Sequence, residues 1–167
     1  MTGTRTSPGR RRAVLLAVAA AVAVAAVATV VAGQLWLRGE RAEDERADQV
    51  RDAADRAVTA VLSYDYRRIE DGMEETAPLL TGDAEAQYVE VQEPLLQTAP
   101  RLKAVVTAEV KSSTVLEHDD DSARVLLFVD QLSSSKKLQQ PQLDQSRVVV
   151  TLARDGGRWL VSTLAAV

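Results

Sequence analysis

Residues 147–164 read RVVVTLARDGGRWLVSTL, two stretches of alternating apolar side chains on either side of an Asp-Gly-Gly turn. Alternation with a period of two is typical of a β-strand, because successive side chains point to opposite faces. Strands are therefore predicted at 147–154 and 158–164. An Asp-Gly pair between two such strands favours a tight hairpin turn at 155–157.

Two more strands are predicted upstream of this hairpin. The stretch 104–116 alternates, with a bulge expected at Ser112-Ser113. The stretch 124–132 is apolar on both faces, which is typical of a strand in the middle of a sheet. A polar turn at 118–122 and a polar loop at 133–143 would connect the strands. The second half of the chain is therefore expected to form a curved four-stranded antiparallel sheet.

Before the strands, the apolar period lengthens to that of helices. One long helix is predicted over 40–66, and a shorter one over 84–97, which Pro94 would kink or end early. The long helix is expected to pack on the chain's own sheet rather than in a coiled coil, because its stripe contains several small alanines. Helices on one face of such a sheet make an α+β domain. The stripe consists of Ala47, Val50, Ala54, Ala57, Val61 and Tyr64, widened by Val58 and Leu62.

Residues 13–37 contain no charged side chain. A helix of this length rises about 37 Å and can cross a hydrocarbon layer of about 30 Å. Trp36 is placed as an aromatic anchor at the interface. The alternative is a cleaved signal peptide, because Ala26-Val27-Ala28 resembles a cleavage site, although the apolar run is longer than that of a typical signal peptide. The stretch is therefore interpreted as an uncleaved transmembrane helix.

The flanking charges orient this helix. Arg10, Arg11 and Arg12 precede it, whereas only Arg38 follows it before the first acidic residues. The positive-inside rule then places the N-terminus in the cytoplasm and the rest of the chain outside, in a single-pass cell-membrane protein. The predicted organisation is a cytoplasmic basic tail at 1–12, a transmembrane helix at 13–37, a charged stalk that begins the long helix at 38–56, and an extracytoplasmic α+β domain at 57–167.

The charge distribution excludes some classes of partner. All 24 acidic residues lie after Arg38, where only 15 of the 20 basic residues are found. Nucleic acid is not expected as a partner, because its binding depends on clustered Lys and Arg. The chain has no cysteine, which removes disulfides and thiolate metal sites and is compatible with an oxidising compartment.

The sequence offers little for catalysis. An isomerase-like site needs a carboxylate base with tyrosine or protonated aspartate donors, and only Tyr64, Asp65, Tyr66 and Asp130 are suited to it. Their spacing is weak support, so we assign no catalytic residue and expect no enzyme. His118 precedes three aspartates, but a solvated turn is favoured over a cation site because the spacing of an EF-hand is missing. No metal or cofactor is expected. The candidate fold-defining or pocket residues are Tyr64, Asp65, Tyr66, Phe128, Asp130, Gln131 and Trp159.

Four stretches together resemble the actinobacterial Mce-associated membrane proteins. They are the uncharged run at 13–37, AVTAVLSYDY at 57–66, SARVLLFVDQ at 122–131 and the hairpin at 147–164. The hairpin is the most specific of them, since these proteins tend to end with a strand, a glycine turn and Gly-Arg-Trp-Leu-Val. The resemblance implies a cone-shaped fold similar to nuclear transport factor 2 (NTF2-like) and cystatin-like domains.

The resemblance also implies a function. It points to a non-catalytic accessory or stabilising subunit of an Mce-type lipid import complex, whose partners would be Mce subunits, a permease and sibling accessory proteins, besides the membrane bilayer. Two alternatives remain open. One is a lipid or small-molecule binding module that uses the mouth of the cone. The other is an inner-membrane scaffold of a secretion machine, since type IV secretion subunits share the layout of a short tail, one span and an outer cone. Homo- or hetero-oligomers are compatible with all three.

Overall fold

A computed structural model of the chain describes residues 43–167, of which residues 46–167 form one compact unit. The predicted basic tail and transmembrane helix, with Arg10, Arg11, Arg12, Trp36 and Arg38, lie outside the described residues. Among the helices of residues 43–167, none combines the length and the apolar character that a membrane crossing requires.

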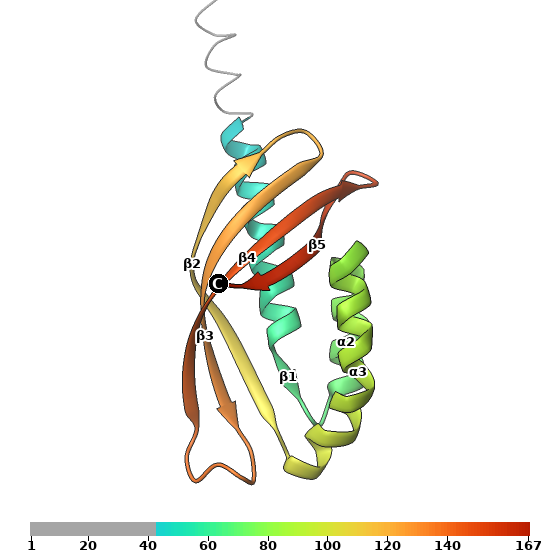
Figure 1. Ribbon diagram of the computed structural model, residues 1–167, viewed down its shortest axis with the longest axis vertical. Helices are drawn as coiled ribbons and strands as arrows, with labels where there is room; N and C mark the ends of the chain where they lie inside the picture. The colour runs from blue at the N-terminus through green and yellow to red at the C-terminus, as the bar shows by residue number, and fades with distance from the viewer. Residues whose placement is uncertain (1–42) are drawn as a thin grey trace, which may run out of the picture. The chain divides into compact units, whose positions relative to one another are not determined.

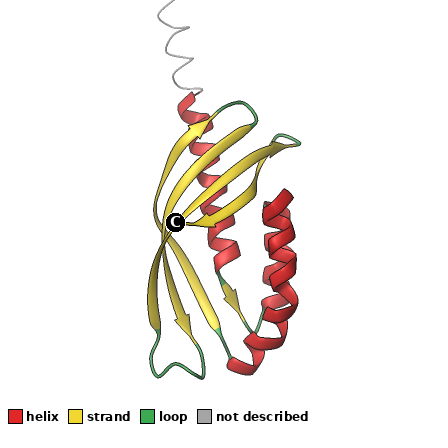
Figure 2. Cartoon of the chain, viewed as in Figure 1, coloured by secondary structure: helices red, strands yellow, loops and turns green. Residues whose placement is uncertain are grey.

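The described chain is an α+β fold, as predicted. Helices gather on the inner side of a curved antiparallel sheet whose strand order is β1-β2-β3-β4-β5 (Figures 1 and 2). In chain order the elements are a helix over residues 43–62, β1 (Tyr64–Asp65), α2 (Ile69–Thr76), the 3-10 turn η1 (Ala77–Leu79), α3 (Gly82–Leu102), β2 (Val105–His118), β3 (Ser122–Ser134), β4 (Gln142–Asp155) and β5 (Arg158–Ala166).

The four predicted strands correspond to β2, β3, β4 and β5. The interpretation of 124–132 as a central strand is confirmed, because β3 pairs with β2 on one side and β4 on the other. The pairing of β2 shifts between Val110 and Ser112, so Lys111 is the extra residue of a bulge, one position before the predicted Ser112-Ser113. The loop between β3 and β4 is shorter than predicted, because both strands extend as a twisted ribbon past the core.

The core lies between the first helix and the concave face of the sheet. Val50, Ala54, Ala57 and Val58 have at most 2% of their surface exposed, and they pack on buried side chains of β2, β3, β4 and β5. Packing of the stripe on the chain's own sheet is thus confirmed. Val50 and Ala54 precede the domain boundary predicted at residue 57 and belong to this core. Its sheet side consists of Ala108, Ala123, Val125, Leu127, Val129, Val148, Val150, Leu152 and Val161.

The prediction that the long helix runs to residue 66 is wrong. The helix ends at residue 62, and Tyr64 and Asp65 instead form β1, paired with Val106 and Val105 of β2. A fifth, two-residue strand therefore closes the edge of the sheet that was predicted to have four strands. The reason is tertiary: the main chain of β2 needs hydrogen-bond partners at this edge, and an aromatic residue such as Tyr64 suits a half-buried strand.

The second predicted helix is longer than expected. α3 continues through Pro94 and ends only after Pro100, where Lys103 adopts a left-handed conformation with φ of 48°. Pro94 removes the hydrogen bond to the carbonyl of Glu90, but both residues are exposed, so water can reach that carbonyl. The start of α3 is fixed to the sheet, since the amide of Thr81 donates to the carbonyl of Val161 at 2.9 Å.

The core packing leads to a testable difference between two leucines of neighbouring strands. Leu127 is fully buried in β3, whereas Leu143 of β4 is 58% exposed. We expect Leu127→Ala to lower the free energy of unfolding by about 2–5 kcal/mol, because it removes buried apolar area and leaves a cavity. Leu143→Ala should change it by less than about 0.5 kcal/mol. Urea unfolding of both variants measures the difference, and equal losses would contradict this description of the core.

Candidate functional site

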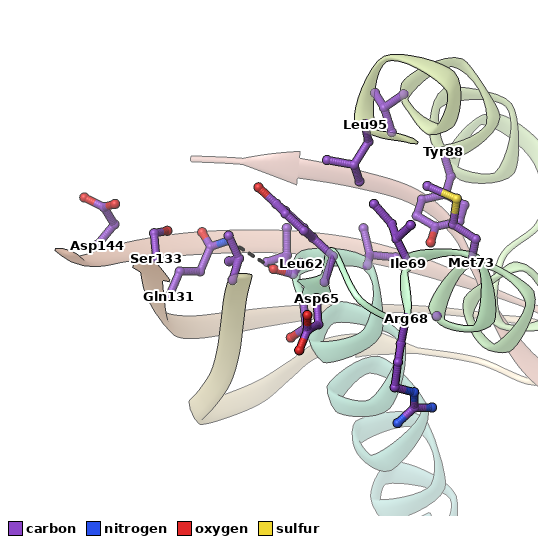
Figure 3. A pocket seen from close by; sticks show the side chains of 16 residues that line it. Leu62, Asp65, Arg68, Ile69, Met73, Tyr88, Leu95, Gln131, Ser133 and Asp144 are labelled. Carbon is purple, nitrogen blue, oxygen red and sulfur yellow. Dashed lines mark hydrogen bonds between the residues drawn. The ribbon is translucent and has the colours of Figure 1, made fainter. Parts of the chain in front are cut away.

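A cavity of about 350 Å³ opens where the first helix ends. Its walls come from the end of that helix, β1, α2, α3 and the inner faces of β2, β3 and β4. Figure 3 shows two ends of different chemistry: Ile69, Met73, Tyr88 and Leu95 gather at one, and Gln131, Ser133 and Asp144 lie at the other. The cavity is therefore apolar against α2 and α3 and polar toward the β3–β4 ribbon. Of the residues just named, only Gln131 was singled out from the sequence.

The mouth of this cavity is held by hydrogen bonds to the edge of β2. The hydroxyl of Ser63 accepts the amide of Ala108 at 2.9 Å, and the amide of Tyr66 donates to the carbonyl of Ala104 at 3.1 Å. The two-residue strand β1 lies between these contacts. The hydroxyl of Ser63 thus takes the place of a backbone acceptor for β2 at the point where the chain leaves the first helix. These contacts fix the position of Tyr64 in the cavity wall.

Asp65 is a turn residue with an ionised side chain. Its carboxylate accepts the backbone amide of Arg67 at 2.9 Å and binds the guanidinium of the same residue. These hydrogen bonds from Arg67 lower the pKa of Asp65 to about 2. A carboxylate with so low a pKa is a poor general base at neutral pH. Asp65 therefore connects β1 to α2 rather than serving as a proton acceptor.

Gln131 joins the sheet to the end of the first helix. Its amide nitrogen donates to the carbonyl of Leu62, the last helical residue, at 3.5 Å (Figure 3). Helix ends leave carbonyls without an intrahelical partner, so this contact satisfies one of them. Gln131 is thus placed at the cavity, as a positioning residue on the inner face of β3.

The four residues suited to isomerase chemistry do not share a site. Phe128 and Asp130 alternate along β3 with the inward Leu127, Val129 and Gln131, so they point to the outer face of the sheet. There Asp130 accepts the side-chain amide of Gln145 at 2.8 Å. The sheet therefore separates Asp130 from Tyr64 and Asp65. Sequence reasoning could not separate them because it lacked the register of β3 against the core.

Trp159 lies at the start of β5, where it is half-buried beside the guanidinium of Arg154, which is 5.8 Å from the centre of its ring. The side chains buried in the core at this point are those of Leu160 and Val161. Trp159 covers the rim of the main core instead. Tyr66 is half-buried beside the smaller cluster around Ile69 and Met73.

The acidic turn after His118 is built from its own hydrogen bonds. One carboxylate oxygen of Asp119 accepts the amides of Asp121 and Ser122 at 3.1 and 2.8 Å. Within residues 43–167, no three or more histidine and acidic side chains come together in a way that could hold a metal ion.

Several solved structures have a similar fold. An IcmL-like type IV secretion system protein of Legionella pneumophila has a TM-score of 0.60 at 17% identity, covering 72% of this chain and 91% of that one. The periplasmic domain of DotI gives 0.59 at 17%, with 71% and 92% covered. CagV of Helicobacter pylori, a VirB8 homologue of a type IV secretion system, gives 0.55 at 11%, with 71% and 96% covered. Residues 46–167 thus share the fold of these secretion-system domains.

Sequence comparison finds mycobacterial relatives. The chain is 34% identical over 116 residues to the uncharacterised protein Rv1362c of Mycobacterium tuberculosis and to its counterpart MT1407 from another strain. The match covers 69% of this chain and 53% of each relative, so the chain spans about half the length of the curated relatives it matches. No protein-family model matches the chain, and its resemblance to Mce-associated proteins is not confirmed.

The depressed pKa of Asp65 predicts a pH effect on stability. The folded value of about 2 lies below the ordinary 3.8, so the ionised carboxylate stabilises the fold above pH 3.8 and this contribution is lost as the pH falls toward 2. Asp65→Asn keeps the side-chain acceptor of the turn and removes the charge. We expect the difference in Tm between wild type and Asp65→Asn to shrink between pH 4 and pH 2. A difference that stays constant over this range would contradict the role given to the ion pair.

The hydroxyl of Ser63 can be tested separately. Ser63→Ala leaves the amide of Ala108 without its acceptor, which should cost about 1–3 kcal/mol of unfolding free energy. Ser63→Thr keeps a hydroxyl and serves as the control. Chemical unfolding of both variants gives the comparison, and equal stability of Ser63→Ala and wild type would show that the contact contributes nothing.

Proposed function

We propose that the chain is a non-catalytic scaffold subunit of a multi-protein complex in a cell envelope. In this proposal residues 13–37 anchor it in the membrane, and the domain stands on the extracytoplasmic side. Support comes from the fold, which it shares with the periplasmic domain of DotI and with CagV, a VirB8 homologue. The residues suited to isomerase chemistry also lie on two faces of the sheet, since Asp130 is on the outer face and Tyr64 and Asp65 are at the cavity. This separation favours a binding role over a catalytic one.

The observation that carries the proposal is a set of exposed apolar side chains on the outer face of the sheet. Phe128, Leu132 and Leu143 are 43%, 48% and 58% exposed. Leu132 and Leu143 are direct cross-strand partners, and between them and Phe128 lies a polar row that contains Asp130 and Gln145. Exposed apolar side chains beside hydrogen-bonding groups are typical of a surface that contacts another protein.

Two complexes compete as the host. The structural neighbours favour a secretion machine, since the Legionella pneumophila protein and CagV belong to type IV secretion systems. The sequence stretches at 122–131 and 147–164 favour the Mce-type lipid importer, where the partners would be Mce subunits, a permease and sibling accessory proteins. At 17% identity or less the structural likeness concerns the fold, so we propose the scaffold role for the chain and leave the choice of host to purification.

Co-purification decides the host. The full chain, tagged at its C-terminus and extracted in mild detergent from cells that contain its natural partners, should bring down a constant set of envelope proteins. Secretion components would place it in a secretion scaffold, and Mce proteins with a permease in a lipid importer. Recovery of the tagged chain alone would contradict the proposed function.

The outer face supplies a variant for this experiment. Leu132→Glu adds a charge to the proposed contact surface, and Val89→Glu adds the same charge to an equally open position of α3, where Val89 is 58% exposed. We expect Leu132→Glu to reduce partner recovery at least about tenfold, because a buried unpaired charge is costly at an interface. Val89→Glu should leave recovery unchanged, and matching thermal unfolding of both variants would exclude a folding defect. Equal recovery with both variants would count against the outer face.

The proposed topology is tested by reporters. A C-terminal alkaline phosphatase fusion should be active and a C-terminal green fluorescent protein fusion dark, because the positive-inside arrangement exports the domain. Replacing Arg10, Arg11 and Arg12 with glutamate should lower the phosphatase signal. Bright fluorescence from the unaltered chain would reverse the orientation.

A further inference from the structure

One edge of the sheet is open beside the cavity. β5 pairs with β4 only from Val148 to Asp155, and the last contact is the amide of Val167 donating to the carbonyl of Arg147 at 3.0 Å. β4 begins earlier, at Gln142, and continues with β3 beyond the end of β5 (Figure 1). Residues 142–146 therefore have β3 on one side and, within the part of the chain described, no strand on the other.

The direction of the open main-chain groups follows from that last contact. In an antiparallel strand the amide and carbonyl of one residue point to the same side, and those of the next residue to the opposite side. Since the carbonyl of Arg147 points toward β5 and the register of β4 is continuous, Gln145 and Leu143 point their main-chain groups to the same open side. An edge with free donors and acceptors can accept an added strand.

The open edge and the cavity share Asp144. This residue faces inward opposite Gln131, and both line the polar end of the cavity. The other acidic residue of the wall, Asp65, is neutralised by Arg67, whereas among residues 43–167 no Lys or Arg lies within ion-pair distance of Asp144. Its carboxylate accepts a hydrogen bond from a neutral group, the side-chain amide of Gln142, at 3.1 Å. The wall thus offers an unneutralised carboxylate next to an unpaired strand edge.

The open edge of β4 is not suited to antiparallel pairing with the same edge of a second copy of this chain. Antiparallel self-pairing with Leu143 opposite Gln145 would bring the two Asp144 carboxylates face to face, and like charges directly opposite are destabilising. A register with Gln145 opposite Gln145 of the second copy would place Leu143 opposite Arg147, whose carbonyl already accepts the amide of Val167. Shifting the other way would set Gln145 against Pro141, which has no amide hydrogen to donate.

We infer that the edge of β4 at residues 142–146 and the cavity together form a docking site for an extended segment of a different protein. This segment carries a Lys or Arg that faces Asp144, with residues of high β-propensity on either side. The main chain of the segment would bond to Leu143 and Gln145. The inference rests on the proposed scaffold function and identifies where one partner binds.

The probe is a fluorescein-labelled peptide of sequence TVKVT, added to the full chain in detergent micelles, with anisotropy as the readout. Its central lysine would face Asp144, and its valines would lie on the face of Leu143. Asp144→Asn should weaken binding about fivefold, the scale of a solvent-accessible ion pair, and should not affect a peptide with norleucine in place of lysine. A peptide with glutamate in place of the lysine should bind more weakly than the lysine and norleucine peptides.

The backbone contact is tested at position 145. Gln145→Pro removes an amide that points away from β3, so the ladder of β3 and β4 is kept and the added strand loses its partner. We expect it to weaken TVKVT binding at least about tenfold. Gln145→Ala is the matched control: it loses the same side-chain bond to Asp130 but keeps the amide, and should bind like wild type. Comparable unfolding temperatures for the two variants would exclude a folding defect.

Equal binding by wild type and Gln145→Pro, or equal binding of the lysine and glutamate peptides, would overturn the inference. The inference would also be overturned if a lipid co-purified in the cavity and the peptide still did not bind after the lipid had been removed. If partners co-purify equally with wild type and Gln145→Pro and the peptide does not bind, the docking site is wrong while the scaffold function stands. If the variants change peptide binding as expected but no partner co-purifies, the scaffold function is wrong while the docking site stands.

Discussion

The fold depends on the close approach of one helix to the concave face of the sheet. Ala54 and Ala57 have small side chains, which lets the helix over residues 43–62 lie close to the strands, and Val58 is fully buried in the same core as Leu127 of the central strand. Burial of apolar area is the main favourable term in folding, and small residues at the contact allow it without voids. The curvature of the sheet around this helix leaves the end of the helix inside the mouth of the domain (Figure 1).

The mouth is therefore a consequence of where the helix stops. After residue 62 the chain must satisfy both the open edge of β2 and the last carbonyls of the helix. Ser63 contributes a hydroxyl to the first and Gln131 an amide to the second, while Asp65 with Arg67 makes the turn into α2. Ser63, Asp65 and Gln131 thus line the cavity while they hold the backbone in place. The shape of the cavity is therefore set by hydrogen bonds within the domain.

The domain presents two different surfaces on one ribbon. Along β3 and β4, Phe128, Leu132 and Leu143 point outward, whereas Gln131 and Asp144 point toward the cavity. Such an arrangement lets one small domain contact partners on both sides of its sheet. The fold shared with the periplasmic domain of DotI does not by itself determine what the domain binds, because the side chains of each face are specific to the chain.

The sequence alone determined the local periods. Alternation predicted β2 to β5 and the central place of β3, and the spacing of Val50, Ala54 and Ala57 predicted which side of the helix is buried, because both patterns are fixed by backbone geometry. Only the tertiary structure decided how segments far apart in the chain meet. Tyr64 pairs with β2 and is not part of the helix, and Asp130 lies on the opposite face of the sheet from Asp65. β4 also extends beyond the end of β5. These outcomes depend on strand register and on hydrogen-bond demands between residues far apart in the chain, which no local pattern records.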